Sequence, residues 1–147
     1  GLFETAKVKV AIEAPAELIQ AHCDQDRIQQ VITNLISNAV KFSPAGSLVT
    51  VEYELAQNGV VIRVRDQGPG IRTEDQPKVF EKFTSVESGK SRLIRGTGLG
   101  LPICKAIVEQ HGGIIGLESQ VGVGSIFYFT LPEVQILPQN LGYEGAA

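Results

Sequence analysis

The spacing of apolar residues predicts helices in three parts of the chain. Between residues 25 and 42, apolar side chains recur at steps of three and four, which is the period of an amphipathic helix: Ile28, Val31, Ile32, Leu35, Ile36, Ala39 and Phe42. Asp24 is suited to cap the start of this helix. A capping-box pattern predicts a short helix over 73–80, and a second amphipathic helix is expected over 102–111, ended by Gly112-Gly113.

Alternation of apolar and polar residues predicts the strands. Val8 and Val10 alternate with Lys7 and Lys9, and Asn58-Gly59, between two such runs, is typical of a tight hairpin. Strands are expected over 7–12, 48–55, 60–66, 114–119 and 125–131. Because most strands neighbour each other in antiparallel pairs with helices between the pairs, we predict an α+β fold. The expected architecture is a two-layer α/β sandwich, a mixed and mostly antiparallel sheet on about three helices.

Composition is that of a single globular domain. The 147 residues are 43% hydrophobic, enough for one core, and we expect a domain over 1–136 and a flexible tail over 137–147. A net charge of -3 gives no reason to expect nucleic acid as a partner. No apolar run approaches the roughly 20 residues of a membrane span and no signal peptide opens the chain, so a cytoplasmic domain is expected. Cys23 and Cys104 form no metal motif and are expected to be reduced thiols.

The stretch SGKSRLIRGTGLGLP, residues 88–102, contains two glycine patterns typical of phosphate sites. A P-loop is excluded because Thr84 stands where that loop needs its first glycine. A dinucleotide fingerprint is excluded because Leu101 replaces its last glycine. Alternating glycines that lead into a helix at Pro102 still place backbone N–H groups where an anion can bind. The polar residues 84–95 before them predict a mobile lid, with Lys90, Arg92 and Arg95 as possible phosphate partners.

Three polar residues form a stripe on the first predicted helix. Asn34, Asn38 and Lys41 lie at i, i+4 and i+7, beside its apolar face. A solvated helix edge is one interpretation of this stripe. Asparagine is a poor helix former, however, and its carboxamide oxygen suits Mg²⁺ that is held mainly by phosphates and water. The stripe is therefore also a candidate metal and phosphate site.

Asp66 stands in phase with the apolar residues of its predicted strand. Val60, Ile62 and Val64 share its side of the sheet, so the carboxylate is expected to point toward the helical layer. Burial without a partner would cost several kcal/mol. A strand-ending Asp in a turn is the simpler interpretation. The functional one is an acceptor for the exocyclic amino group of adenine, with Gly68 and Gly70 permitting close approach to the backbone.

Five short motifs occur in a specific order between Asp24 and Pro132: NLISNAVKFSP, DQGPGI, FEKF, GTGLGL and GVGS. With them the chain resembles the catalytic ATP-binding domain of bacterial sensor histidine kinases, in the GHKL superfamily with its Bergerat fold. One such motif would be weak evidence, whereas five in order are specific. Arg95 departs from the pattern, because a small residue often fills that position.

The resemblance implies ATP and Mg²⁺ as ligands and a role for each matched residue. Asn38 would coordinate the metal with support from Asn34, Lys41 would contact phosphate, and Phe42 would pack near adenine. The adenine pocket would comprise Asp66, Gly68, Gly70 and Ile71, with Thr130 in a water network around Asp66. The phosphates would be wrapped by Gly96, Thr97, Gly98, Leu99, Gly100 and Leu101. Phe80 and Phe83 would anchor the lid, and Arg92 would sense the terminal phosphate, which makes Asn38, Lys41 and Arg92 the catalytic set.

The expected reaction is γ-phosphoryl transfer to a histidine. Related ATPases carry a water-activating glutamate at the position of Asn34, which cannot act as a base, so hydrolysis by that route is expected to be slow. Neither His22 nor His111 has a phosphoacceptor-like context. The acceptor is therefore expected on a separate dimerisation and phosphoacceptor domain, with a response regulator downstream and the fragment itself monomeric. An anti-sigma-type serine kinase, or a nucleotide-binding module without phosphotransfer, are the alternatives.

Overall fold

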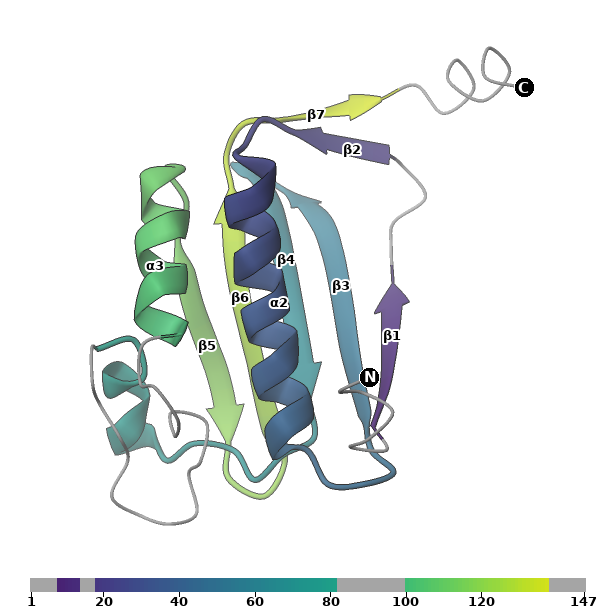
Figure 1. The fold of residues 1–147 in the computed structure, drawn as a ribbon, viewed down its shortest axis with the longest axis vertical. Helices are drawn as coiled ribbons and strands as arrows, with labels where there is room; N and C mark the ends of the chain where they lie inside the picture. The colour runs from purple at the N-terminus through teal and green to yellow at the C-terminus, as the bar shows by residue number, and fades with distance from the viewer. Residues whose placement is uncertain (1–7, 14–17, 82–99, 138–147) are drawn as a thin grey trace.

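A five-stranded sheet forms one layer of the fold. The computed structural model describes residues 8–13, 18–81 and 100–137. The strands lie in the order β1-β3-β4-β6-β5 (Figure 1). Their bounds are β1 Lys9–Glu13, β3 Leu48–Ala56, β4 Gly59–Asp66, β5 Ile115–Gln120 and β6 Gly124–Leu131. Only the edge pair β1 and β3 is parallel among these neighbours, so the prediction of a mixed, mostly antiparallel sheet is confirmed.

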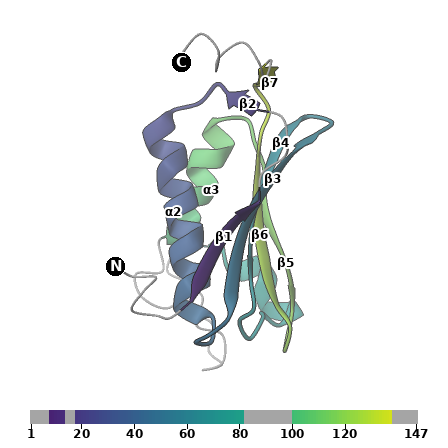
Figure 2. The same ribbon diagram turned by 90° about the vertical axis from the view of Figure 1, so that its right-hand side faces the viewer.

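Two helices, α2 (Gln25–Phe42) and α3 (Gly100–Gln110), cover one face of this sheet (Figure 2). The core lies between the layers. Its fully buried side chains include Val31 and Leu35 from α2, Val64 from β4 and Phe129 from β6. Each such side chain contributes about 1.5–3 kcal/mol by leaving water. The predicted α+β sandwich is therefore confirmed.

The helix α2 begins and ends where the sequence predicts. The Asp24 carboxylate accepts a hydrogen bond from the backbone N–H of Arg27 at 3.2 Å, which satisfies one of the free donors of the first turn. Ser43 ends the helix in an extended conformation. The fully buried residues repeat at the helical period, which explains why this long pattern was easy to interpret.

A second, two-stranded sheet lies at the upper end of the fold and was not predicted. It pairs β2 (Leu18–Ala21) with β7 (Val134–Leu137) in antiparallel register, and Gln135 Nε2 donates to Gln20 Oε1 at 3.0 Å. Both strands have only four residues, too few for an alternating pattern to stand out. Apart from Leu137, the expected tail lies outside the described residues.

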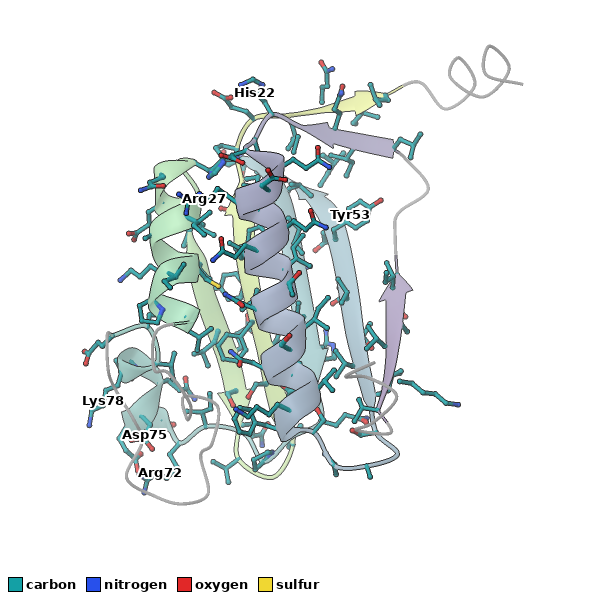
Figure 3. The ribbon with its side chains drawn as sticks, viewed as in Figure 1. His22, Arg27, Tyr53, Arg72, Asp75 and Lys78 are labelled. Atoms are coloured by element: carbon teal, nitrogen blue, oxygen red, sulfur yellow. The ribbon has the colours of Figure 1, made fainter. Side chains whose placement is uncertain are left out.

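The short helix after β4 differs from the prediction. The segment η1 (Thr73–Lys78) is a 3₁₀-helix, and its N-cap is Arg72, which makes no side-chain capping bond. The predicted capping box is therefore wrong. Instead, Arg72 Nε donates to the buried Asp75 carboxylate at 2.8 Å, and the two side chains lie together beside η1 (Figure 3).

The β3–β4 hairpin turns one residue earlier than predicted. Ala56 pairs with Gly59, so Gln57-Asn58 forms the turn and Gly59 opens β4. Gly59 has a φ of +131°, and a Cβ there would collide with the carbonyl oxygen of Leu131. The glycine is therefore required by the neighbouring strand β6 rather than by the turn itself.

The end of α3 agrees with its glycines. Gly112 adopts a φ of +78°, its N–H donates to the carbonyl of Glu109, and the N–H of Gly113 donates to that of Val108, each at 3.0 Å. This is a Schellman ending, which satisfies carbonyls that the helix leaves free. Within the described ranges, no helix combines the length and the apolar character needed to cross a membrane.

Candidate functional site

Three described segments that carry predicted site residues are the last turns of α2, the end of β4 and the first turn of α3. The ends of α2 and β4 lie toward the lower end of the fold together with the β5–β6 turn, whereas α3 begins higher, beside α2 (Figure 1). These segments are far apart in the sequence, and the sheet order brings β4 and β6 together.

Asp66 is the last residue of β4 and is 5% exposed. Its Oδ1 accepts from the backbone N–H of Gly68 at 2.8 Å and from that of Ser125 at 3.3 Å. Its Oδ2 is the one buried side-chain polar atom without a partner in the described part of the chain. Burial raises the pKa of this carboxyl above its ordinary value, and the two backbone hydrogen bonds oppose the rise. The residue is therefore half satisfied, with one oxygen left for a donor.

The loop after Asp66 lies very close to the backbone at the end of α2 and at the end of β5. A Cβ on Gly68 would lie 2.9 Å from the carbonyl oxygen of Phe42. Gly70 has a φ of +80°, and a Cβ there would collide with the carbonyl of Gln120. These glycines shape the surroundings of Asp66 by letting α2 and the β5–β6 turn approach the loop closely.

The predicted stripe on α2 ends beside this loop. Asn38 is half-buried one turn before Phe42, which packs partly against the core. Lys41 is exposed, and its Nζ lies 5.4 Å from the centre of the Phe42 ring, within cation–π distance. A carboxamide and a cation therefore lie on the last two turns of α2, whose end at Phe42 approaches Gly68 in the loop after Asp66.

Asn34 contacts the neighbouring helix. Its Nδ2 donates to the Sγ of Cys104 in α3 at 3.6 Å, and Cys104 is fully buried. Burial raises the pKa of the Cys104 thiol, which keeps it protonated near neutral pH. The side chain of Asn34 thus links α2 to α3 and is not simply a solvated helix edge.

Some predicted residues have their side chains in the core. Ile71 and Leu101 are 1% and 3% exposed, so only part of each can face a ligand. Gly100 has open space where a Cβ would stand. Phe80 packs edge-to-face on Phe127 with ring centres 6.3 Å apart. Six further predicted residues lie outside the described residues: Phe83, Arg92, Gly96, Thr97, Gly98 and Leu99.

The predicted role of Thr130 is wrong. On β6, Ser125 is the partner of Asp66, whereas Thr130 pairs with Val61 at the far end of β4. Thr130 stands five positions after Ser125 on the same strand, so their side chains also lie on opposite faces of the sheet. Thr130 Oγ1 instead accepts from the backbone N–H of Ile114 at 2.9 Å.

Sequence reasoning missed two buried or half-buried serines beside Asp66. Ser125 donates its backbone N–H to Asp66 and is 2% exposed. Its Oγ lies 2.7 Å from the Oγ of Ser119, the residue opposite it on β5. The position of Ser125 directly after Gly124 was the available signal, but only the strand register relates it to Asp66.

The described donor set fits a particular kind of metal site. No three His, Cys, Asp or Glu side chains among the described residues are grouped to hold an ion. Mg²⁺ bound through substrate phosphates needs only one or two protein oxygens, and the carboxamide oxygen of Asn38 is of the required type. These residues therefore suit an ion that arrives with phosphate, and not one caged by protein alone.

Comparison with protein families gives one match over most of the chain. Residues 23–135 match the family described as histidine kinase-, DNA gyrase B- and HSP90-like ATPases. The sensor histidine kinase WalK of Bacillus subtilis is 42% identical over 135 residues, which cover 88% of this chain and 22% of that protein. The chain thus spans about a fifth of the length of this curated relative.

Solved structures of histidine kinases have the same fold. The catalytic domain of histidine kinase ThkA is 30% identical with a TM-score of 0.76, and the match covers 89% of this chain and 82% of that one. Full-length ShkA in complex with AMPPNP is 28% identical with a TM-score of 0.80, over 93% of this chain and 28% of that one. ThkA in complex with the response regulator protein TrrA is also similar, with a TM-score of 0.72, 28% identity and coverages of 89% and 36%.

Proposed function

Because the chain belongs to the family of histidine kinase-, DNA gyrase B- and HSP90-like ATPases, as a catalytic domain of the sensor histidine kinase type, we propose that it binds ATP with Mg²⁺ and transfers the γ-phosphoryl group to a histidine. The acceptor belongs to a separate dimerisation and phosphoacceptor domain. The observation that carries the proposal is the unpartnered Oδ2 of Asp66, buried at the end of β4. A buried carboxylate oxygen costs free energy until a donor reaches it.

Asp66 selects adenine by the hydrogen bond that its free oxygen can accept. Oδ1 is occupied by the N–H groups of Gly68 and Ser125, so Oδ2 is the oxygen that faces a ligand. The exocyclic amino group of adenine donates to it. Guanine presents a carbonyl oxygen at the same position, and two acceptors facing each other in a dry site repel. Gly68, Gly70 and the half-buried Phe42 border this pocket.

The phosphates lie between the end of α2 and the start of α3. The exposed Lys41 supplies positive charge, and the first turn of α3 at Gly100 and Leu101 supplies free backbone N–H groups and the positive end of the helix dipole. The carboxamide oxygen of Asn38 would hold Mg²⁺, which would supply neutralisation of the phosphate charge. The roles that the resemblance implies are kept for six further residues: Phe83, Arg92, Gly96, Thr97, Gly98 and Leu99.

The side chains in the described site favour transfer over hydrolysis. Asn34 is a neutral amide bonded to Cys104 and cannot activate water. A neutral imidazole nitrogen of the acceptor forms a bond to the γ-phosphorus as the bond to the bridging oxygen of ADP breaks. The proton on the other ring nitrogen is then released to solvent. The protein contributes positioning and charge neutralisation.

The two histidines of this chain do not serve as that acceptor. His111 Nε2 accepts from the backbone N–H of Asp24 at 3.0 Å, and its Nδ1 lies 2.8 Å from the carbonyl oxygen of Ile107. Both ring nitrogens are therefore occupied by the protein. His22 lies at the upper end of the molecule, opposite to η1 and the Asp66 loop (Figure 3). The chain spans a minor part of WalK, which leaves room in such a parent for an acceptor domain.

Nucleotide titration tests the binding half of the proposal. The chain should bind ATP and ADP in preference to GTP, and Mg²⁺ should strengthen ATP binding more than ADP binding, because ATP offers the ion an additional phosphate. Isothermal titration calorimetry with and without Mg²⁺ measures both effects. Equal affinity for ATP and GTP would contradict base recognition by Asp66.

Phosphotransfer requires an added acceptor. The chain is mixed with radiolabelled ATP and the dimerisation and phosphoacceptor domain of its parent kinase. An acid-labile, base-stable label on that domain supports histidine transfer. An acid-stable label would indicate a serine kinase, and no label despite normal ATP binding would indicate a nucleotide-binding module; either result contradicts the proposal.

A further inference from the structure

The backbone of Ile71, in the loop after Asp66, is held by side chains at both its N–H and its C=O group. Its N–H donates to Ser119 Oγ at 2.7 Å, across 48 positions of sequence. Its carbonyl oxygen accepts from Gln76 Nε2 at 3.0 Å, and the same nitrogen lies 3.2 Å from the carbonyl oxygen of Ser119. The loop is thus attached to β5 and η1 by two side chains, neither of which belongs to the loop.

The hydroxyl of Ser119 has a complete set of partners. It lies 2.7 Å from Ile71 N, 2.7 Å from Ser125 Oγ and 3.1 Å from the carbonyl oxygen of Gly124. A hydroxyl donates once and accepts twice. All three contacts are satisfied when Ser119 donates to Gly124, accepts from the N–H of Ile71 and accepts from the hydroxyl of Ser125. Removing this oxygen would leave two donors without an acceptor.

The strand register also connects Ser119 to Asp66 by way of Ser125. Ser125 is the partner of Ser119 on one side and of Asp66 on the other. The backbone N–H of Ser125 donates to Asp66 Oδ1. The second bond to that oxygen comes from the N–H of Gly68, in the same loop as Ile71. Ser119 therefore joins both segments whose N–H groups orient the carboxylate, and it does so without touching the carboxylate.

We propose that Ser119, supported by Gln76, is a positioning residue for nucleotide binding: its hydroxyl holds the Ile71 peptide and Ser125 together so that Asp66 Oδ2 points at the base. This inference rests on the proposed function of Asp66. Neither side chain is expected to contact the ligand. Instead, they fix the direction of one buried acceptor, Asp66 Oδ2. A hydrogen bond in a buried site depends strongly on its angle, so a small displacement of this oxygen weakens it.

The test compares Ser119→Ala, Ser119→Thr and Gln76→Leu in the full chain. Ser119→Ala should weaken ATP binding roughly tenfold, and by the same factor for ADP and with or without Mg²⁺, because the base and not the phosphates is displaced. Ser119→Thr keeps the hydroxyl and should restore binding. Gln76→Leu should cost a smaller factor. Gln135→Leu removes a carboxamide bond of the same kind in the β2–β7 sheet and serves as the matched control.

A second readout separates positioning from a general loss of stability. If the bond from Ser125 N–H to Asp66 is loosened, the charged carboxylate loses a donor and its pKa rises. The pH at which ATP affinity declines should then move upward in Ser119→Ala, measured by calorimetry well below the unfolding temperature. A lower Tm with unchanged affinity and unchanged pH midpoint would overturn the inference.

The remaining outcomes separate this inference from the proposed function. If wild type prefers ATP over GTP and Asp66→Asn removes that preference while Ser119→Ala binds like wild type, only the positioning role fails. If wild type shows no base preference, the proposed function fails as well. Should Ser119→Ala not fold, Gln76→Leu decides alone: unchanged affinity and pH midpoint in that variant overturn the inference.

Discussion

The two ends of the β4–β6 strand pair differ in how they use their polar groups. At the upper end, Thr130 accepts from Ile114 N, and the turn after α3 closes on the carbonyls of Glu109 and Val108. At the lower end, two backbone N–H groups converge on one oxygen of Asp66 while the other oxygen has no partner among the described residues. Along the same strand pair, the polar groups named at the upper end are paired, whereas the lower end keeps one buried acceptor without a partner among the described residues.

Two carboxylates in the described part of the chain are similarly buried but differ in whether a buried oxygen lacks a partner. Asp75 is 4% exposed, but Arg72 bonds to it at 2.8 Å and makes it part of the structure. Asp66 is equally buried and is bonded to backbone N–H groups on Oδ1 alone. The informative feature is the oxygen that remains, because leaving it unpaired destabilises the free protein and binding a donor removes that cost.

The largest expected effect comes from Asp66→Asn. In the variant the amide oxygen takes the two backbone donors, so its NH₂ group faces the amino group of adenine, donor against donor. ATP affinity should fall roughly 10- to 100-fold, measured by calorimetry. Stability should change by no more than about 1 kcal/mol, measured by urea unfolding, because the buried charge is removed while the amide oxygen keeps both backbone hydrogen bonds. Unchanged ATP affinity in a folded variant would remove Asp66 from the site.

The variant Asn38→Ala tests Mg²⁺ binding separately from recognition of the adenine base. If the carboxamide oxygen is a Mg²⁺ ligand, the variant should lose about tenfold in ATP affinity with Mg²⁺ present and much less in EDTA. Calorimetry under both conditions measures the ratio. Ser37→Ala, the preceding half-buried residue on α2, is a control for general damage to the helix. Equal losses with and without the ion would argue against a metal role for Asn38.

Acidification should act on binding and on stability in opposite directions. Burial raises the pKa of Asp66 above 3.8 in the folded protein. The amino group of adenine requires the charged form, so ATP affinity should decline as pH falls through this raised value. The free protein, which binds the proton more tightly than the unfolded chain, should lose stability from this group as pH rises through the same window.

Both signs can be measured against one control. Asp66→Asn has no titrating group at position 66 but retains the titration of the phosphates of ATP. The difference in pH dependence between wild type and Asp66→Asn therefore reports Asp66 alone. Identical pH profiles of ATP affinity in the two proteins would contradict ionised Asp66 as the acceptor.

The smallest effect on binding is expected at the upper end. Thr130→Val leaves the N–H of Ile114 without its acceptor and should lower the free energy of unfolding by about 1 kcal/mol. Its ATP affinity should equal that of wild type, because Thr130 lies on the other face and at the other end of the sheet from Asp66. A loss of ATP affinity as large as that expected for Ser119→Ala would contradict the claim that only the lower end takes part in ATP binding.

The sequence predicts most of the fold because its long elements follow single periods. The helix α2 is marked by seven apolar positions at the helical period, and β4 by alternation of apolar and polar residues from Ile62 to Arg65. Alternation also places Asp66 on the helical side of the sheet, which the structure confirms through its burial. Short elements without a full period were missed, as β2 and β7 show.

Details that depend on neighbours in space were not predictable. The capping box predicted at Thr73 does not form, and Arg72 bonds to Asp75 there instead. Gly59 is needed because the backbone of β6 lies close to it. The family resemblance implies Thr130 in a water network around Asp66. Only the register of β4 with β6 shows that the neighbour of Asp66 is Ser125. A one-dimensional pattern identifies the face of a strand but not the residue across from it.

The hydrogen bond between Asp66 and adenine is tested most directly by deleting the donor from the ligand. Purine riboside triphosphate lacks only the exocyclic amino group of ATP. We predict that wild type binds it roughly 10- to 100-fold more weakly than ATP in calorimetry. In Asp66→Asn the preference for ATP should be lost, and purine riboside triphosphate should bind at least as tightly as ATP because it avoids the donor-against-donor contact; this change of preference is the coupling that a direct contact predicts. Equal affinity of wild type for both nucleotides would contradict recognition of the amino group by Asp66.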